Sequence, residues 1–126
     1  MDSLPSIFLV SLGAILGASL RVYIVSYAGI NSIKKYHLTL LVNVTSSFFL
    51  GYLLALSSQI NRIQYYNELL LFLGVGFLGG FSTFSTFIFD LFLFLKGGQF
   101  KKFFDLACLS IVFGLLLGYV GYLIGR

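Results

Sequence analysis

Hydroxyl and aromatic side chains alternate in the middle of the third apolar stretch of this chain. Residues 74–87 read GVGFLGGFSTFSTF, with four Ser or Thr residues placed around Phe84 and Phe87. Hydroxyl and backbone N–H groups donate hydrogen bonds, and the edge of a Phe ring carries partial positive charge. Polar atoms and non-helical backbone persist at bilayer depth only where protein or a water-filled cavity satisfies them. The segment therefore predicts part of an ion or solute path.

The adjacent glycines in this stretch suggest a break in the helix. We expect the break between Gly79 and Thr83, where it would separate two half-helices. The end of the first half would expose carbonyl oxygens, which suit a small cation. The start of the second half would expose N–H groups, which suit an anion.

Two aromatic rings follow the expected break. Phe84 and Phe87 are three residues apart and so share a helix face, with the hydroxyls of Ser85 and Thr86 beside them. Rings presented edge-on can line the route of an anion without trapping it. Alternatively, these rings are ordinary lipid-facing side chains in a chain with 15 Phe residues. The neighbouring glycines and hydroxyls favour the first interpretation.

The second apolar stretch carries an amide. Thr39 and Asn43 are four residues apart and share a face, which Ser46 or Ser47 extends by one turn. An Asn side chain has two N–H donors and one carbonyl acceptor, and leaving it unsatisfied in lipid costs several kcal/mol. Asn43 either bonds to another helix or presents N–H donors to a dehydrated anion.

The first stretch carries a cation on a glycine stripe. Gly13, Gly17 and Arg21 follow one another at four-residue spacing, and the glycines allow a neighbouring helix to approach closely. Arg21 either extends to the lipid headgroups or faces protein, where it would attract anions or brace an interface. In the fourth stretch, Ser110 either bonds back to its own helix or contributes a polar group to the path.

The elements that must position these residues are membrane-spanning helices. The chain has 126 residues, of which 59% are hydrophobic and 10% are charged, with a mean hydropathy of +1.01. A helical span takes about 20 apolar residues, and four stretches reach that length, at about 6–28, 38–58, 68–95 and 104–125. We therefore expect an all-α integral membrane protein: one domain, 1–126, of four transmembrane helices with the third broken at its middle.

The charges of the chain lie mainly at the ends of these stretches. The net charge of +4 therefore does not indicate nucleic-acid binding, and one Cys and one His do not make a conventional zinc or iron site. The Lys and Arg residues of the first and third connections outnumber those of the second connection and the C-terminus by five to two: Lys34, Lys35, Lys96, Lys101 and Lys102 against Arg62 and Arg126. The positive-inside rule then predicts cytoplasmic first and third connections and both termini outside.

A set of residues spread over all four stretches carries a family resemblance. The set comprises Gly13, Gly17 and Arg21; Thr39, Leu40, Val42, Asn43, Phe48 and Gly51; Gly76, Gly79, Gly80, Thr83, Phe84, Ser85, Thr86, Phe87 and Asp90; and Ser110 and Gly114. In this order and spacing, the chain resembles the CrcB/Fluc fluoride channels along essentially its whole length. The resemblance implies a multi-pass protein of the cell (plasma or inner) membrane that passively exports fluoride from the cytoplasm and so reduces fluoride toxicity.

The resemblance also implies an assembly and a set of site residues. The family unit is an antiparallel dimer with two pores along the subunit interface and a structural, untransported Na⁺ at its centre, which backbone carbonyls hold; here these would be Gly79 and Ser82. The residues implied to line the fluoride path are Phe84, Phe87, Asn43, Ser85, Thr86 and Ser110, with Thr39 as a weaker candidate. The partner would be a second copy of dual topology or, given the loop-charge bias, an oppositely oriented paralogue.

Several positions depart from the family pattern: Ala14, Val22, Ser46, Ser82 and Leu106. Ser82 stands for a threonine, which matters little if its carbonyl is the ligand. The main alternative function is that of a small four-helix proton-coupled multidrug exporter. Proton coupling calls for a carboxylate deep in a span, whereas Glu68 and Asp90 lie toward the ends of the third. No nucleophile is paired with a base, so we do not expect an enzyme.

Overall fold

The computed structural model describes residues 3–28, 35–59 and 65–126, and these ranges are almost entirely helical without a strand. Helix α1 comprises Ser3–Ala28, α2 comprises Lys35–Gln59 and α6 comprises Phe100–Gly125. The third span consists of α3 (Tyr66–Leu69), the π-helical η1 (Leu70–Leu78), α4 (Gly79–Phe81) and α5 (Phe84–Lys96). Four segments are long and apolar enough to cross a membrane: Leu4–Tyr27, Lys35–Ser57, Tyr66–Lys96 and Phe100–Gly125. The expected all-α fold with four transmembrane helices is confirmed.

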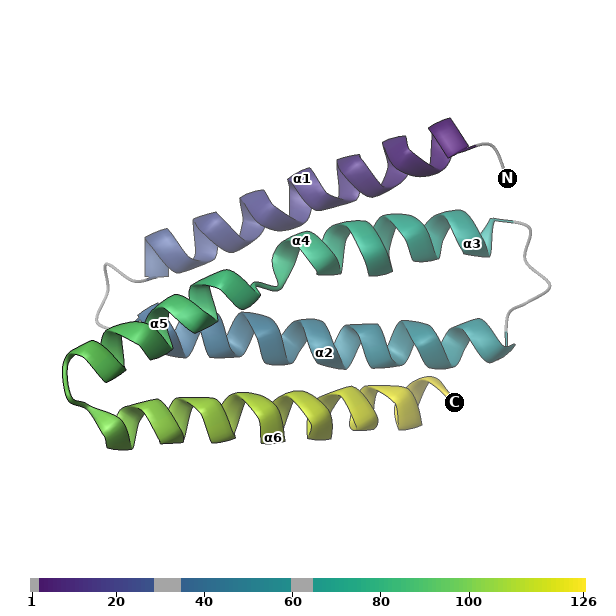
Figure 1. Cartoon of the computed structure of the whole chain (residues 1–126). Helices are drawn as coiled ribbons and strands as arrows, with labels where there is room; N and C mark the ends of the chain where they lie inside the picture. Colours follow the sequence, from purple (N-terminus) through teal and green to yellow (C-terminus); the bar gives the residue numbers. More distant parts are fainter. Residues whose placement is uncertain (1–2, 29–34, 60–64) are drawn as a thin grey trace.

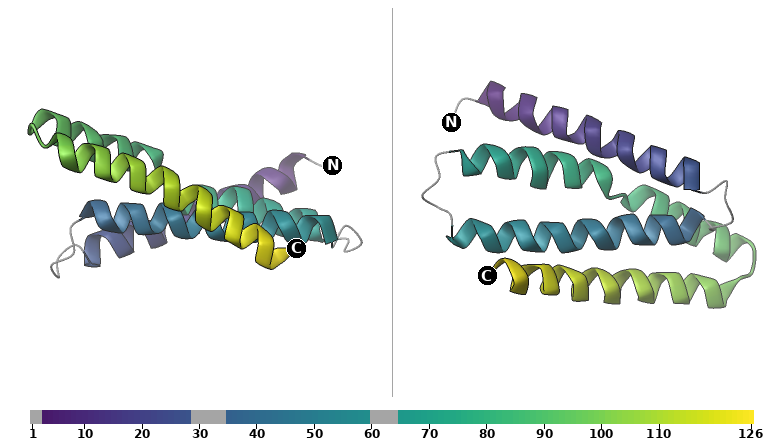
Figure 2. Two further views of the ribbon diagram at one scale, coloured as in Figure 1. Left: turned by 90° about the horizontal axis from the view of Figure 1, so that it is seen from below. Right: turned by 180° about the vertical axis from the view of Figure 1, so that it is seen from behind.

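The spans lie side by side in an order that differs from their order in the chain. α1 is followed by the first half of the third span, then by α2 and α6, and α1 begins at the end of the bundle where α6 finishes (Figure 1). α1 packs mainly on η1 and α4, and α2 packs mainly on α6. From below, α5 and the start of α6 diverge from α1 and from the start of α2 (Figure 2). The third span thus packs on α1 with its first half and leaves α1 with its second.

Glycines set the distance between α1 and the third span. A Cβ at Gly17 would overlap the carbonyl oxygen of Phe77, and one at Gly80 would lie 2.5 Å from the carbonyl oxygen of Ala14. Backbone therefore meets backbone, as in other small-residue contacts between membrane helices. The expected close approach at Gly13 and Gly17 is confirmed.

The break in the third span is shorter than expected. Gly79 is helical, with φ −64° and ψ −39°, and the N–H of Ser82 still donates to the carbonyl oxygen of Leu78 at 2.9 Å. Only Ser82 (ψ 157°) and Thr83 (φ −148°, ψ 121°) are extended. The expectation of a break in this span is confirmed, but the prediction that it begins at Gly79 is wrong. The neighbouring Gly80 serves close helix packing and not irregular backbone.

The predicted orientation rests partly on residues beyond the described part of the chain. Lys34 and Arg62 lie outside the described residues. Lys96, Lys101 and Lys102 lie at the end of α5 and the beginning of α6, where those two helices meet. The orientation stays a prediction.

Candidate functional site

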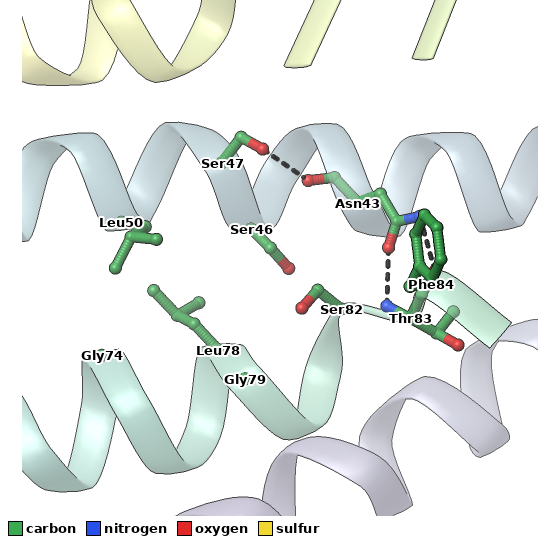
Figure 3. Close-up of a pocket in the computed structure, with 10 residues that line it drawn as sticks. All are labelled: Asn43, Ser46, Ser47, Leu50, Gly74, Leu78, Gly79, Ser82, Thr83 and Phe84. Carbon is green, nitrogen blue, oxygen red and sulfur yellow. Dashed lines mark hydrogen bonds between the residues drawn. The ribbon is translucent and has the colours of Figure 1, made fainter. Parts of the chain in front are cut away.

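A pocket opens where the third span breaks. It has a volume of about 300 Å³, and side chains of α2 face the break across it (Figure 3). The lining residues are Asn43, Ser46, Ser47, Leu50, Gly74, Leu78, Gly79, Ser82, Thr83 and Phe84. None of these ten has an ionisable side chain. The pocket is thus polar but uncharged.

Asn43 holds the break with two hydrogen bonds. Its Oδ1 accepts from the backbone N–H of Thr83 at 2.7 Å, and its Nδ2 donates to the carbonyl oxygen of Thr83 at 2.9 Å. The orientation of the amide is settled by its partners, because a backbone N–H only donates and a carbonyl only accepts. Of the two alternatives for Asn43, the structure supports bonding to another span. One N–H of the amide remains beyond the Thr83 bond.

This clamp changes the end of the first half-helix. In a continuous α-helix the N–H of Thr83 would donate to the carbonyl oxygen of Gly79, four residues earlier. Thr83 donates to Asn43 instead, so the Gly79 carbonyl loses that helical partner. Carbonyls at a helix end carry partial negative charge. A negative pole therefore lies beside the pocket that Gly79 and Ser82 line.

Thr83 also caps the second half-helix. Its Oγ1 accepts from the backbone N–H of Thr86 at 3.3 Å, lies 3.1 Å from the Thr86 Oγ1 and lies 3.4 Å from the Ser85 Oγ. An extended residue whose hydroxyl bonds to the N3 amide is a typical N-cap. The hydroxyls of Ser85 and Thr86, expected along the path, thus gather at the positive end of α5.

The two expected pathway rings lie next to each other. The ring centroids of Phe84 and Phe87 are 6.1 Å apart with an interplanar angle of 46°. Phe84 lines the pocket and is 75% exposed, whereas Phe87 is half-buried. The Phe84 ring is therefore available to a molecule outside this subunit.

Three other predicted residues lie away from the pocket lining. Thr39 is 2% exposed, and its Oγ1 donates to the carbonyl oxygen of Lys35 at 3.2 Å. The Ser110 Oγ on α6 and the Arg21 Nε on α1 are buried without a hydrogen-bond partner among the described residues. The Ser110 hydroxyl therefore does not bond back to its own helix. The Arg21 Nε is covered by protein.

Two contacts involve residues whose roles sequence reasoning missed. The first is the double role of Thr83, although a Thr three residues before Thr86, at the start of an apolar run, is a recognisable N-cap signal. The second is the hydrogen bond from the Tyr66 hydroxyl to the carbonyl oxygen of Leu53, at 2.6 Å. It ties α3 to α2 near the end of the bundle, and no spacing rule joins these two positions.

Comparison with known proteins shows similarity over nearly the whole chain. The family model described as CrcB-like protein, Camphor Resistance (CrcB), matches residues 8–122. The chain is 44% identical over 123 residues to a fluoride-specific ion channel FluC 1 of Parasynechococcus marenigrum, covering 98% of this chain and 95% of that protein. It is 39% identical to FluC 2 of Prochlorococcus marinus strain NATL2A, with 91% and 98% covered, and 36% identical to FluC of Pyrococcus abyssi, with 98% of both covered.

Proposed function

The chain belongs to the CrcB-like family, and from this premise we propose that it is a fluoride-specific ion channel and not an enzyme. It is a multi-pass membrane protein, and as a channel of the plasma membrane it would let fluoride leave the cytoplasm down its gradient. One observation carries the proposal from the structure. The break at Ser82–Thr83 places the N-terminal end of α5, the Asn43 amide and the Phe84 ring around one uncharged pocket.

The pocket offers the groups that a dehydrated fluoride ion needs. Fluoride is small and strongly hydrated, so a dry path must supply donors in place of water. The positive end of α5 attracts an anion, and the remaining N–H of Asn43 and the edge of Phe84 supply donors in the pocket, with the ring of Phe87 next to Phe84. The hydroxyls of Ser85, Thr86 and Ser110 would continue the path, and the weaker candidate Thr39 lies one turn before Asn43 on α2.

The uncharged lining supports passive conduction over proton-coupled export. An exporter driven by protons needs a group in its transport pathway that binds and releases them. None of the ten residues around the pocket does so near neutral pH. Movement of fluoride down its gradient requires no such step.

The exposed Phe84 supports a pore that lies between subunits. A second subunit over this face would cover the ring and close the open side of the pocket. We propose an antiparallel dimer with two such pores, formed by two copies of the chain or by the chain and an oppositely oriented paralogue. Arg21, with its buried and unpartnered Nε, would add positive charge near the path or brace the interface.

A structural Na⁺ at the centre of this dimer fits the residues present. Hard cations prefer oxygen ligands, and the Gly79 carbonyl has lost its helical partner to the Asn43 clamp. Gly79 and the extended Ser82 both line the open pocket, so their carbonyls would hold the ion together with those of a second subunit. The ion would supply fixed positive charge at the interface and would not itself be transported.

Fluoride efflux from liposomes tests the function. Purified protein is reconstituted into liposomes loaded with potassium fluoride, and efflux is started with valinomycin and followed with a fluoride electrode. We expect rapid fluoride efflux and none of chloride from matched chloride-loaded liposomes. The proposal fails if folded protein passes no fluoride either alone or together with an oppositely oriented paralogue.

A further inference from the structure

We propose that Asn43 is a positioning residue that sets the cation affinity of the carbonyl oxygens at the end of α4. It does so by holding the one backbone N–H that would otherwise close on Gly79. The inference takes the identity of the cation, Na⁺, from the proposed function. It adds a link between a side chain of α2 and a backbone site on the third span.

Two acceptors compete for the N–H of Thr83. One is the carbonyl oxygen of Gly79, the acceptor in a continuous helix, and the other is the Oδ1 of Asn43, which the N–H contacts at 2.7 Å. Ser82 and Thr83 are extended, and in this conformation the N–H of Thr83 donates to Asn43. When the N–H of Thr83 bonds to Asn43, the Gly79 carbonyl is free to bind a cation. Without Asn43, the helix can extend by one hydrogen bond and occupy that oxygen.

The second bond of the amide makes the clamp specific. The Nδ2 of Asn43 donates to the carbonyl oxygen of the same residue, Thr83, at 2.9 Å. Two bonds to one residue fix its orientation as well as its position. A shorter side chain with a single hydroxyl group in place of the amide could not make both bonds. Asn43 is half-buried, and an amide shielded from water that loses its partners is costly, which favours the clamped state.

The clamp is separable from the cap on α5. The clamp uses the backbone atoms of Thr83, whereas the cap uses its Oγ1, which bonds to the N–H of Thr86. Thr83→Val therefore removes the cap and leaves the clamp. Ser46 offers a second control, because its hydroxyl lines the same pocket but donates only to the Val42 carbonyl of its own helix.

The test is a sodium titration of thermal unfolding in detergent, with N-methylglucamine as the replacing cation. Binding to the folded state stabilises it by an amount that grows with the logarithm of ligand concentration above the dissociation constant. Fitting this rise gives the sodium concentration at which half of the folded sites are occupied, which we call the sodium midpoint. We expect Asn43→Leu, which is similar in size, to raise the sodium midpoint by about tenfold, as the loss of a hydrogen bond to a buried group implies. Asn43→Asp keeps the acceptor for Thr83 and should not raise the midpoint, although its charge should reduce fluoride efflux.

The controls separate positioning from general damage. Thr83→Val and Ser46→Ala should change the unfolding temperature equally at all sodium concentrations and leave the midpoint in place. A backbone ester at residue 83, introduced by semisynthesis, removes the N–H of Thr83, which would otherwise compete with the cation for the Gly79 carbonyl oxygen. In this ester background Asn43→Leu should no longer raise the midpoint, which also provides the test if Asn43→Leu alone does not fold.

The outcomes distinguish this inference from the proposed function. An unchanged sodium midpoint in Asn43→Leu overturns the inference, and so does a wild-type protein that sodium does not stabilise. In both cases fluoride efflux would still support the channel. If the sodium midpoints shift as expected but the protein passes no fluoride, the inference stands and the proposed function fails.

Discussion

Two glycines on α6 give a matched test of how closely the helices pack. A Cβ at Gly121 would overlap the carbonyl oxygen of Phe48 on α2 and lie 3.1 Å from the N atom of Tyr52. A Cβ at Gly114, two turns earlier, would come no closer than 3.8 Å to the Oγ of Ser47. Both glycines lie within one helix and face the same neighbour. Replacing each by Ala changes the same chemistry in a tight site and in a loose one.

The magnitude follows from two opposing terms. Gly→Ala within a helix favours the folded state by up to roughly 1 kcal/mol, at both positions alike. At Gly121 the new methyl group must also push two backbones apart, and overpacking of this kind costs about 1–3 kcal/mol. A gap of about 0.5–1 Å between the helices would forfeit a quarter to a half of each dispersion contact across it. The difference between the two variants should therefore equal the overpacking cost, about 1–3 kcal/mol.

Reversible unfolding in mixed micelles of dodecyl maltoside and SDS measures this difference. We expect Gly114→Ala to be as stable as the wild type or slightly more stable, and Gly121→Ala to be less stable than Gly114→Ala by about 1–3 kcal/mol. Equal free energies of unfolding for the two variants would refute the backbone contact between α2 and α6. A destabilised Gly114→Ala would refute the assignment of free space at that position.

Three further predictions follow from individual contacts. Tyr66→Phe removes the hydrogen bond to the Leu53 carbonyl and should lower the free energy of unfolding by about 0.6–2 kcal/mol, measured in the same micelles. A loss no larger than that of a Tyr→Phe substitution at an exposed tyrosine would argue against this hydrogen bond. Thr83→Val should cost about 1 kcal/mol through loss of the N-cap, whereas Thr83→Ser should retain most of the stability, and equal losses in both would contradict the cap. Phe84→Leu keeps the apolar volume but removes the ring edge, so fluoride efflux from liposomes should fall while chloride stays excluded; unchanged efflux would remove Phe84 from the path.

The spans and the existence of the break were predictable from the sequence because both are local signals. Hydropathy over about 20 residues is sufficient to locate a span. The adjacent glycines and the hydroxyl residues amid apolar ones in the third stretch indicated that the backbone departs from helix there. The exact break was not predictable, because glycine permits both irregular backbone and close packing. Gly80 has the second role, because a Cβ there would lie 2.5 Å from the carbonyl oxygen of Ala14.

The partners of the site residues depended on contacts distant in the chain. Asn43 and Thr83 are 40 residues apart, and no local pattern shows that a side chain on α2 binds the backbone of the third span. The residue pattern alone left two alternatives for Asn43; the structure shows its bonds to another span, and donation to an anion by its remaining N–H stays a proposal. The cap by Thr83 is different, because its signal lies within four residues and was available from the sequence.

The pairing of the helices bears on how the chain is made. α1 packs mainly on the first half of the third span, and α2 packs mainly on α6, while α1 and α2 have few contacts. For each of the first two spans, the main neighbour is thus not the next span to emerge from the ribosome but the one after it. The first two spans are therefore synthesised before the spans on which they mainly pack. With mean hydropathies of 2.0 and 1.7, each of these two spans is long and apolar enough to cross a membrane before its main neighbour is made.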